Sequence, residues 1–318
     1  MTTRTHLSDR IGRRMKLQDL HVLLTVVQAG SMGKAAQRLH TSQPAISRSI
    51  AELEHTFGVR LLDRGPLGVE PTEYGRALLD GGLAVFDDLR QTVKNIEFLA
   101  DPEAGEVRIG STSFLAASLI SAVIDRLSQR CPRMAFHLVT ASAEALQHEL
   151  NERNVDLLIM RRFGPLAEER LDFEFLFDDS FVVAVGAQSP WARRRRIELA
   201  ELVNEPWLLP PPESMVDLIA RDAFRASGLE YPRATVVTLT VEVRMSLLAT
   251  GRFVTILPES VLKFPKKHSE LKILPIALPT ARVPSGIVTL KNRRLNPAAQ
   301  LFIDCTREVA NLVAKGKR

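Results

Sequence analysis

Residues 31–64 carry hydroxyl, amide and basic side chains of the kinds that bind DNA, spaced to lie on the outer side of two short helices. Gln and Arg side chains hydrogen-bond the major-groove edges of adenine and guanine, whereas Ser, Thr, Lys and Arg commonly bind phosphates. The residues expected to contact bases are Gln43, Pro44, Ser47 and Arg48. The residues expected to hold phosphates are Ser31, Lys34, Thr41, Ser42, Arg60 and Arg64.

Two helices must position these side chains. The segment Ser31 to Leu39 has Ala and Leu at helical spacing and is predicted to form the first helix. His40-Thr41 breaks it, and a second helix begins after a cap at Ser42 or Thr41, with Pro44 in its first turn. Such a pair predicts a helix-turn-helix, although an ordinary helical hairpin in a core has the same pattern. The apolar stripe of the second helix is Ala45, Ile46, Ile50 and Leu53.

Positive charge is concentrated around this helical pair. Residues 1–64 hold ten Lys or Arg and five Asp or Glu, whereas the other 254 residues hold 32 of each sign. The entire net charge of +5 therefore surrounds the two helices. Because binding a polyanion releases its counterions, this location favours DNA as the partner over a simple solvated surface.

A wing and a long helix are predicted after the pair. Val59, Leu61 and Leu62 are apolar, and the turn Gly65-Pro66-Leu67-Gly68 indicates a small β-hairpin. Thr72 caps the next helix, which extends to about Ala100. Apolar residues at three- and four-residue spacing predict that this helix dimerises with a second copy, although packing against its own domain is an alternative. This seam comprises Leu79, Gly82, Phe86, Leu89, Val93, Ile96 and Ala100.

The rest of the chain alternates between predicted strands and helices. Strands are expected at 106–112, 134–140 and 155–160, with helices at 114–130 and 143–153 between them, and two adjacent strands at 173–186. A second series comprises a helix at 212–228, a strand at 233–239, a helix at 241–249, strands at 252–258 and 285–290, and a helix at 297–314. This order predicts parallel βαβ units in two α/β lobes, with a ligand cleft between them.

Polar residues gather where these strands end. Strand ends border the ligand cleft in such sheets, and helix N-termini there favour anions. Any single Ser or Thr is explained equally well by helix capping. Arg161 or Arg162 is expected to give a bidentate contact to a carboxylate. The expected ligand-binding residues are Ser111, Thr112, Ser113, Phe114, Thr140, Ser142, Arg161 and Thr238.

The N-terminal motif resembles the signature of LysR-type transcriptional regulators, FLAxAxxGSxxxAAxxLxxSQPAxSxxIxxLExxxGxxLxxR. The resemblance covers about residues 15–310 and implies a regulator that binds double-stranded promoter DNA as a homodimer or homotetramer under the control of a small-molecule effector. The matching residues are Leu20, Leu23, Ala29, Gly30, Ser31, Ala35, Ala36, Leu39, Ser42, Gln43, Pro44, Ala45, Ser47, Ile50, Leu53, Glu54, Gly58, Leu61 and Arg64, with Thr72 and Gly75 following.

The resemblance also implies the domain organisation. It places a winged helix-turn-helix at 15–72, a dimerising linker helix and hinge at 73–104, and an effector-binding domain at 105–318. That last domain is expected to be a two-lobed α/β structure similar to type 2 periplasmic binding proteins. Residues 1–14 are expected to form a disordered basic tail, or to precede a start at Met15.

Some positions depart from the family's pattern. The wing tip at 65–68 lacks the usual basic residues, so phosphate contact should rest more on Arg60 and Arg64. Phe114 and Ala143 stand where relatives commonly have polar residues in the pocket. We therefore expect the effector to be an organic acid, aromatic or sugar-derived, rather than a small polar amino acid.

Other classes of protein find little support. The sequence lacks the GxxxxGK[ST], GxSxG and HExxH motifs and any zinc-spaced Cys/His set, so we predict no enzyme activity, metal site or cofactor. Its two cysteines, Cys131 and Cys305, form no pairing motif, which suits a reducing cytoplasm. No apolar run is long enough to cross a membrane. The remaining alternative is a small-molecule binding protein whose N-terminal helices are a protein-interaction module.

Overall fold

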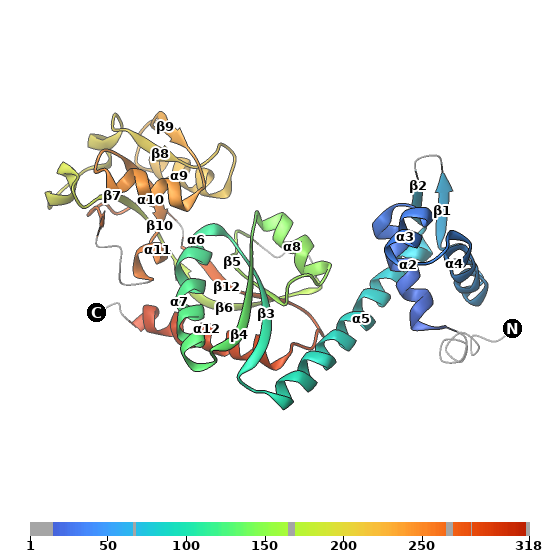
Figure 1. Cartoon of the computed structure of the whole chain (residues 1–318). Coiled ribbons are helices and arrows are strands. Elements are labelled where there is room, and N and C mark those ends of the chain that lie inside the picture. The colour runs from blue at the N-terminus through green and yellow to red at the C-terminus, as the bar shows by residue number, and fades with distance from the viewer. Residues whose placement is uncertain (1–14, 66–67, 165–168, 265–269, 281, 316–318) are drawn as a thin grey trace, which may run out of the picture. The chain divides into compact units, whose positions relative to one another are not determined.

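The chain divides into two units at Arg90, with unit 1 formed by residues 1–90 and unit 2 by residues 91–318 (Figure 1). The computed structural model describes residues 15–65, 68–164, 169–264, 270–280 and 282–315. The expected N-terminal tail and the tip of the wing, Pro66-Leu67, lie outside the described residues. Among the residues described, no helix is both long and apolar enough to span a membrane.

Unit 1 begins with three helices that pack on one another. They are α2 (Leu17–Ala29), α3 (Met32–Arg38) and α4 (Gln43–Phe57). The side-chain oxygen of Ser31 accepts from the Lys34 amide at 3.2 Å and caps α3, and Ser42 caps α4 by accepting from the Ala45 amide at 3.4 Å. The left-handed backbone at Gly58 (φ 73°) ends α4. The predicted pair of helices is therefore confirmed, and of the two caps considered for the second helix the structure shows Ser42.

The wing follows as the predicted hairpin. Strands β1 (Leu62–Gly65) and β2 (Gly68–Pro71) pair antiparallel, and α5 (Glu73–Ala100) comes directly after them. A carboxylate oxygen of Glu54 accepts from the amide of Leu61 at 2.8 Å, which fixes the base of the wing to α4. The hydroxyl oxygen of Thr72 accepts from the Gly75 amide at 3.0 Å and caps α5, as predicted.

Gly75, in the first turn of α5, is required because the wing approaches it closely. A Cβ at this position would lie 2.0 Å from the backbone oxygen of Leu61, which also accepts a hydrogen bond from the Thr72 amide. We expect Gly75→Ala to lower the free energy of unfolding by about 2 kcal/mol or more. Urea unfolding followed by circular dichroism would measure this loss.

A matched control lies in the same helix at Gly81. A Cβ added there meets nothing within 4 Å, so Gly81→Ala should gain up to about 1 kcal/mol of helix propensity. A Gly75→Ala protein as stable as the Gly81→Ala protein would contradict the expected clash.

The predicted seam of α5 divides into a buried and an exposed part. Leu79 belongs to the core of unit 1, Phe86 packs against that core, and a Cβ on Gly82 would lie 2.9 Å from the Leu20 side chain. This part of the seam therefore packs on its own domain. The exposed part comprises Leu89, Val93 and Ile96. Val85 and Leu99, which were not predicted in the seam, extend it to a surface here called the α5 stripe (Val85, Leu89, Val93, Ile96 and Leu99), whose exposed fractions run from 41% to 81%.

Unit 2 consists of two α/β lobes, and the first is built on a five-stranded sheet with the order β4-β3-β5-β12-β6. Its strands are β3 (Ala104–Ser111), β4 (Arg133–Thr140), β5 (Leu157–Arg161), β6 (Leu171–Asp179) and β12 (Val283–Leu290). The strands β3, β4 and β5 are parallel, as predicted, whereas β12 is antiparallel to both of its neighbours. The sheet is therefore mixed, because β12 returns to it from the second lobe.

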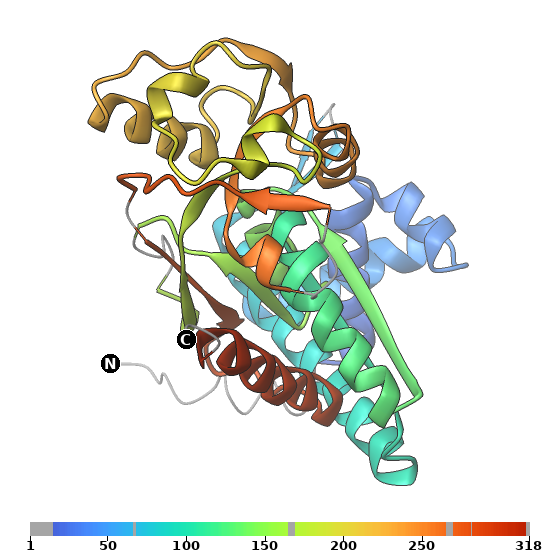
Figure 2. The same cartoon turned by 90° about the vertical axis from the view of Figure 1, so that its left-hand side faces the viewer.

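Helices cover both faces of this first sheet. The helix α8 (Ala143–Asn151) packs on one face through Leu146 and Leu150, and α7 (Ser121–Arg130) lies beside α12 (Pro297–Lys315) on the other (Figure 2). The helix predicted at 114–130 is interrupted. It begins as α6 (Ser113–Leu115), widens into a π-helical segment (Ala116–Ile120), and continues as α7.

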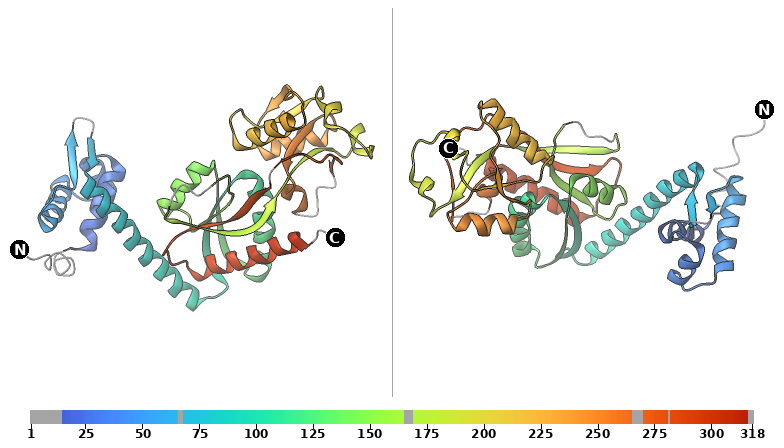
Figure 3. Two further views of the ribbon diagram at one scale, coloured as in Figure 1. Left: turned by 180° about the vertical axis from the view of Figure 1, so that it is seen from behind. Right: turned by 90° about the horizontal axis from the view of Figure 1, so that it is seen from above.

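The second lobe has a five-stranded sheet with the order β11-β7-β10-β8-β9. Its strands are β7 (Phe181–Gly186), β8 (Trp207–Leu209), β9 (Ala234–Val237), β10 (Val254–Pro258) and β11 (Leu271–Ile273), and its longer helices are α9 (Met215–Ala226) and α10 (Val241–Ala249). Short helical turns lie at Pro190–Arg193, Leu199–Leu202 and Ser260–Lys263 (α11). The chain passes between lobes at Ser180 and again after β11 (Figure 3).

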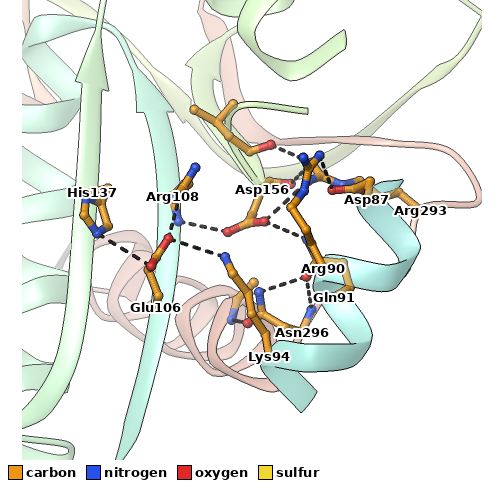
Figure 4. A network of polar contacts seen from close by, with 12 residues as sticks. Asp87, Arg90, Gln91, Lys94, Glu106, Arg108, His137, Asp156, Arg293 and Asn296 are labelled. Carbon is orange, nitrogen blue, oxygen red and sulfur yellow. Dashed lines mark hydrogen bonds and ion pairs between the residues drawn. The ribbon is translucent and has the colours of Figure 1, made fainter. Parts of the chain in front are cut away.

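The second part of α5, from Gln91 onward, is tied into the first lobe by a buried polar network (Figure 4). The Gln91 amide nitrogen donates to Asp156 at 3.2 Å, and its oxygen accepts from the Asn296 amide nitrogen at 2.9 Å. Asp156 also accepts from the Arg108 backbone amide at 2.9 Å and pairs with Arg293 at 3.4 Å. The predicted domain boundary at 105 thus falls about fourteen residues after the point where contacts of unit 2 begin.

Candidate DNA-contact surface and ligand pockets

The outer face of α4 carries the predicted base-contacting residues. Gln43, Pro44 and Arg48 are exposed, and Ser47 is half-buried. Ala45, which was expected in the apolar stripe, is instead exposed on this outer face. The stripe that does pack into the core consists of Ile46, Ile50 and Leu53. The helix therefore presents one short apolar residue beside its amide and guanidinium groups, a combination suited to base edges and to a thymine methyl group.

The residues predicted to hold phosphates surround that face. Lys34, Thr41, Arg60 and Arg64 are exposed, and Arg64 lies on β1 of the wing. Ser31 and Ser42 lie at the N-termini of α3 and α4, where unpaired backbone amide groups favour an anion. The predicted phosphate-binding residues are thus placed at the start of α3, before α4 and on the wing.

One residue that positions α4 was missed in the sequence. Asp19 of α2 is buried and accepts a hydrogen bond from the Ser49 hydroxyl on α4. The signal was the single acidic residue of this helix, in its first turn. This contact fixes the inner side of α4 and so sets the direction in which its outer face points.

In unit 2, Arg161 is engaged in a contact between the two lobes. Its guanidinium donates to Asp179 at 2.6 and 2.9 Å and to the Ser260 hydroxyl at 3.0 Å. Ser260 in turn donates through its hydroxyl to Asp179 at 2.6 Å, and all three residues are buried. The guanidinium of Arg161 thus bonds Asp179 of the first lobe and Ser260 of the second, and in this structure it joins the two lobes.

Phe114 does not line an open cleft. It belongs to the first lobe, yet its buried ring packs among residues of the second lobe, including Leu208, Val241 and Leu257. Phe114 therefore occupies the space between the lobes, and its contact with the effector stays a prediction. The sequence showed that an aromatic residue replaces a polar one here, but not where its ring would go.

The other predicted ligand residues fall into four environments. Ser111 is buried and donates to the backbone oxygen of Ile159 at 2.7 Å, so it serves the sheet. Ser142 caps α8 by accepting from the Ala145 amide at 3.3 Å, and Thr238 accepts from the Thr240 amide at 3.0 Å. Ser113 and Thr140 are exposed. The hydroxyl of Thr112 is buried and has no hydrogen-bond partner among the described residues.

A pocket opens close to these residues, beside the start of α8. Its volume is about 180 Å³, and Arg162, Phe163 and Gly164 line part of it. The guanidinium carbon of Arg162 lies 4.5 Å from the centre of the Phe173 ring. Arg162 is exposed, and the described residues show no carboxylate paired with it. The remaining lining residues are Ala143, Glu144, Gln147, Met160, Arg161, Phe173, Met215 and Val288.

This pocket was only partly predictable. Arg162 was singled out in the sequence because it follows a strand end, and Ala143 because relatives commonly have a polar residue there. Phe173 of β6 and Met215 of α9 carry no local signal of a binding role, and only the fold brings them to Arg162. Together the lining offers an exposed cation, an aromatic ring and a flexible thioether.

Comparisons with known proteins agree with both units. Residues 17–76 match the family model described as bacterial regulatory helix-turn-helix protein, lysR family, and residues 100–311 match the LysR substrate binding domain. The uncharacterised HTH-type transcriptional regulator YdcI of Escherichia coli (strain K12) is 25% identical over 297 residues, covering 93% of this chain and 96% of that protein. The transcriptional dual regulator GltC of Bacillus subtilis (strain 168) is 28% identical over 292 residues, covering 91% and 96%.

Solved structures show the same fold. A full-length OxyR variant from Pseudomonas aeruginosa superposes with a TM-score of 0.64 at 24% identity, covering 93% of this chain and 97% of that one. Full-length CbnR in complex with its target DNA gives a TM-score of 0.52 at 22% identity, covering 93% and 100%. A winged helix-turn-helix, a long helix and a two-lobed α/β domain are therefore the shared architecture.

Proposed function

Since this chain belongs to the LysR family of transcriptional regulators, we propose that it binds promoter DNA as a homodimer or homotetramer and changes its DNA binding when a small organic acid occupies unit 2. The proposal that the protein binds promoter DNA rests on the outer face of α4, which has exposed Gln43 and Arg48 and no acidic residue before Glu52. Gln can pair with adenine and Arg with guanine in the major groove. A protein acting on promoters would work in the cytoplasm.

The proposed effector is an organic acid with an apolar or aromatic body. The support is the pocket beside α8, where Arg162 offers an exposed guanidinium and Phe173, Met160 and Met215 offer apolar surface. A carboxylate bound to Arg162 would form charge-assisted hydrogen bonds, and an aromatic body could contact Phe173 and Met215. The N-terminus of α8 is already occupied by the carboxylate of Glu144, which accepts hydrogen bonds from its own backbone amide and from Ser142, so the proposed anion contact rests on Arg162.

A thermal-shift screen of the full-length protein tests this proposal. We expect an aromatic or a sugar-derived acid, with benzoate and gluconate as first probes, to raise the melting temperature, because a ligand of the folded state stabilises it. Arg162→Gln should weaken binding of an acid found in this way by roughly tenfold or more, since hydrogen bonds to charged groups contribute about 1.5–3 kcal/mol.

Two further variants locate the ligand. Arg195→Gln removes an exposed arginine of the second lobe outside the pocket and should leave the affinity unchanged. Thr112→Val with Ser142→Ala tests the hydroxyl groups predicted from the sequence. If Arg162→Gln and the Thr112/Ser142 variant both bound the acid like the wild type, the proposed pocket would be wrong.

A further inference from the structure

The short segment Arg60-Leu61-Leu62, which leads from α4 into the wing, is held by hydrogen bonds on two sides. On its amide side, one carboxylate oxygen of Glu54 accepts from the Leu61 amide at 2.8 Å and from the Leu62 amide at 3.4 Å. On its carbonyl side, the Thr72 hydroxyl donates to the Arg60 oxygen at 2.8 Å, and the Thr72 amide donates to the Leu61 oxygen at 3.0 Å. Leu61 and Leu62 are buried. This segment is therefore fixed between α4 and the start of α5.

The second strand of the wing is attached to the helix-turn-helix as well. The Val69 amide donates to the backbone oxygen of Gly30 at 3.0 Å, and a Cβ on Gly68 would lie 2.6 Å from that same oxygen. Gly30 ends α2 and directly precedes Ser31, the cap of α3. Both strands of the wing are thus held by contacts that leave the hairpin little freedom to turn.

The charges of the wing make its orientation decisive. Residues 60–71 contain two basic and two acidic residues, so their net charge is zero. The basic residues are Arg60 and Arg64, and the acidic ones are Asp63 and Glu70. Asp63 pairs with Glu70 across the hairpin, and both are exposed. Since successive side chains of a strand point to opposite faces, Arg64 lies on the face opposite to Asp63. One face of the wing would therefore attract a phosphate, and the other would repel it.

We propose that Glu54 and Thr72 are positioning residues for DNA binding, which turn the arginine face of the wing, rather than its acidic face, toward the DNA that α4 contacts. Glu54 belongs to α4, so the helix that carries Arg48 also sets the direction of the wing. A phosphate held by Arg64 would then lie at a fixed distance from the bases that Arg48 contacts. The inference rests on the proposed binding of promoter DNA, and neither Glu54 nor Thr72 needs to touch the DNA itself.

The salt dependence of binding to a short duplex of random sequence tests this inference, because each phosphate contact contributes about 0.9 to the slope of log affinity against log salt concentration. In the full-length Glu54→Ala protein this slope should fall by about 1 to 2, since Arg60 and Arg64 would lose their phosphates. Glu54→Gln has the same net charge as Glu54→Ala but keeps an oxygen that can accept from both amides, so it should recover most of the slope. Fluorescence anisotropy at several salt concentrations would measure it.

A control and a double-mutant cycle separate positioning from a general effect on charge or folding. Glu52→Ala removes an exposed carboxylate of the same helix and should keep the wild-type slope. In a background of Arg60→Gln with Arg64→Gln, adding Glu54→Ala should lower the slope no further, because no arginine is left to position. A further fall in that background, or a wild-type slope for Glu54→Ala alone, would overturn the inference.

Thr72 offers a second route if circular dichroism shows that Glu54→Ala does not fold. Thr72→Val removes the hydroxyl that holds the Arg60 oxygen, whereas Thr72→Ser keeps it. The slope should fall for Thr72→Val and recover for Thr72→Ser, and equal slopes for the two would overturn the inference. These outcomes are distinct from a failure of the proposed function, in which the wild-type protein itself would bind no DNA.

Discussion

Placing glutamates at Leu89 and Val93 is expected to convert the protein to a lighter species and to abolish promoter binding. Both side chains lie on the α5 stripe, with 45% and 54% of their surface exposed. A stripe of large apolar residues on a long helix calls for a partner helix, and a second copy of α5 offers a matching one. Charges buried there would raise the dimer dissociation constant by about a hundredfold or more.

Sedimentation velocity would measure the change in mass, and a gel-shift assay the loss of DNA binding. Two winged helix-turn-helix units usually bind two half-sites together, so separated subunits should lose most of their affinity. Glu97→Lys is the matched control, because it changes the charge of an exposed residue on α5 outside the stripe. If the double glutamate variant kept the wild-type mass, the α5 stripe would not be the main interface.

Arg48→Ala should weaken binding to the specific promoter site by about 1–3 kcal/mol, a loss of roughly 5- to 150-fold, and weaken binding to random DNA less. The reason is that Arg48 is exposed on the outer face of α4, whose inner face is fixed by Ser49 and Asp19. Titrations at a fixed salt concentration, with the region upstream of a regulated gene and with random DNA, would measure both losses.

Arg38 offers the control for Arg48. It is equally exposed and basic, but it lies in the last turn of α3, away from the outer face of α4. Arg38→Ala should therefore leave the preference for the specific site intact. Equal losses on specific and random DNA for Arg48→Ala would show that Arg48 only contacts phosphates. A wild-type protein that binds no promoter DNA would favour the alternative of a protein-interaction module.

Local signals were enough to predict the helix-turn-helix. Ser31, Ser42 and Gly58 act within one turn of their own helix, and their roles as caps follow from their residue types. The wing and most strands of the two lobes were also predicted, because turn residues and apolar alternation mark them. The short strands β8 and β11 were missed, since three residues are too few to show a period.

The contacts that could not be predicted are those between residues far apart along the chain. Arg161 meets Ser260 ninety-nine residues later, and Phe114 packs among residues of the other lobe, so neither partner was visible locally. The division of the α5 seam into a buried and an exposed part could not be predicted for a different reason. Leu79 and Leu89 have the same spacing pattern, and only the position of the neighbouring helices decides that one is buried and the other exposed.

The Gln91 network has a consequence for how this protein could be recombined with its relatives. Gln91, Asp156, Arg293 and Asn296 form one buried set, so a fragment that begins at Gly105 would leave Asp156 and Asn296 without the side chain of Gln91. Exchanging DNA-binding units between two regulators should succeed when the junction lies near Arg90, within α5. A junction at the apparent hinge after Ala100 would combine a foreign helix with an effector domain that needs its own glutamine.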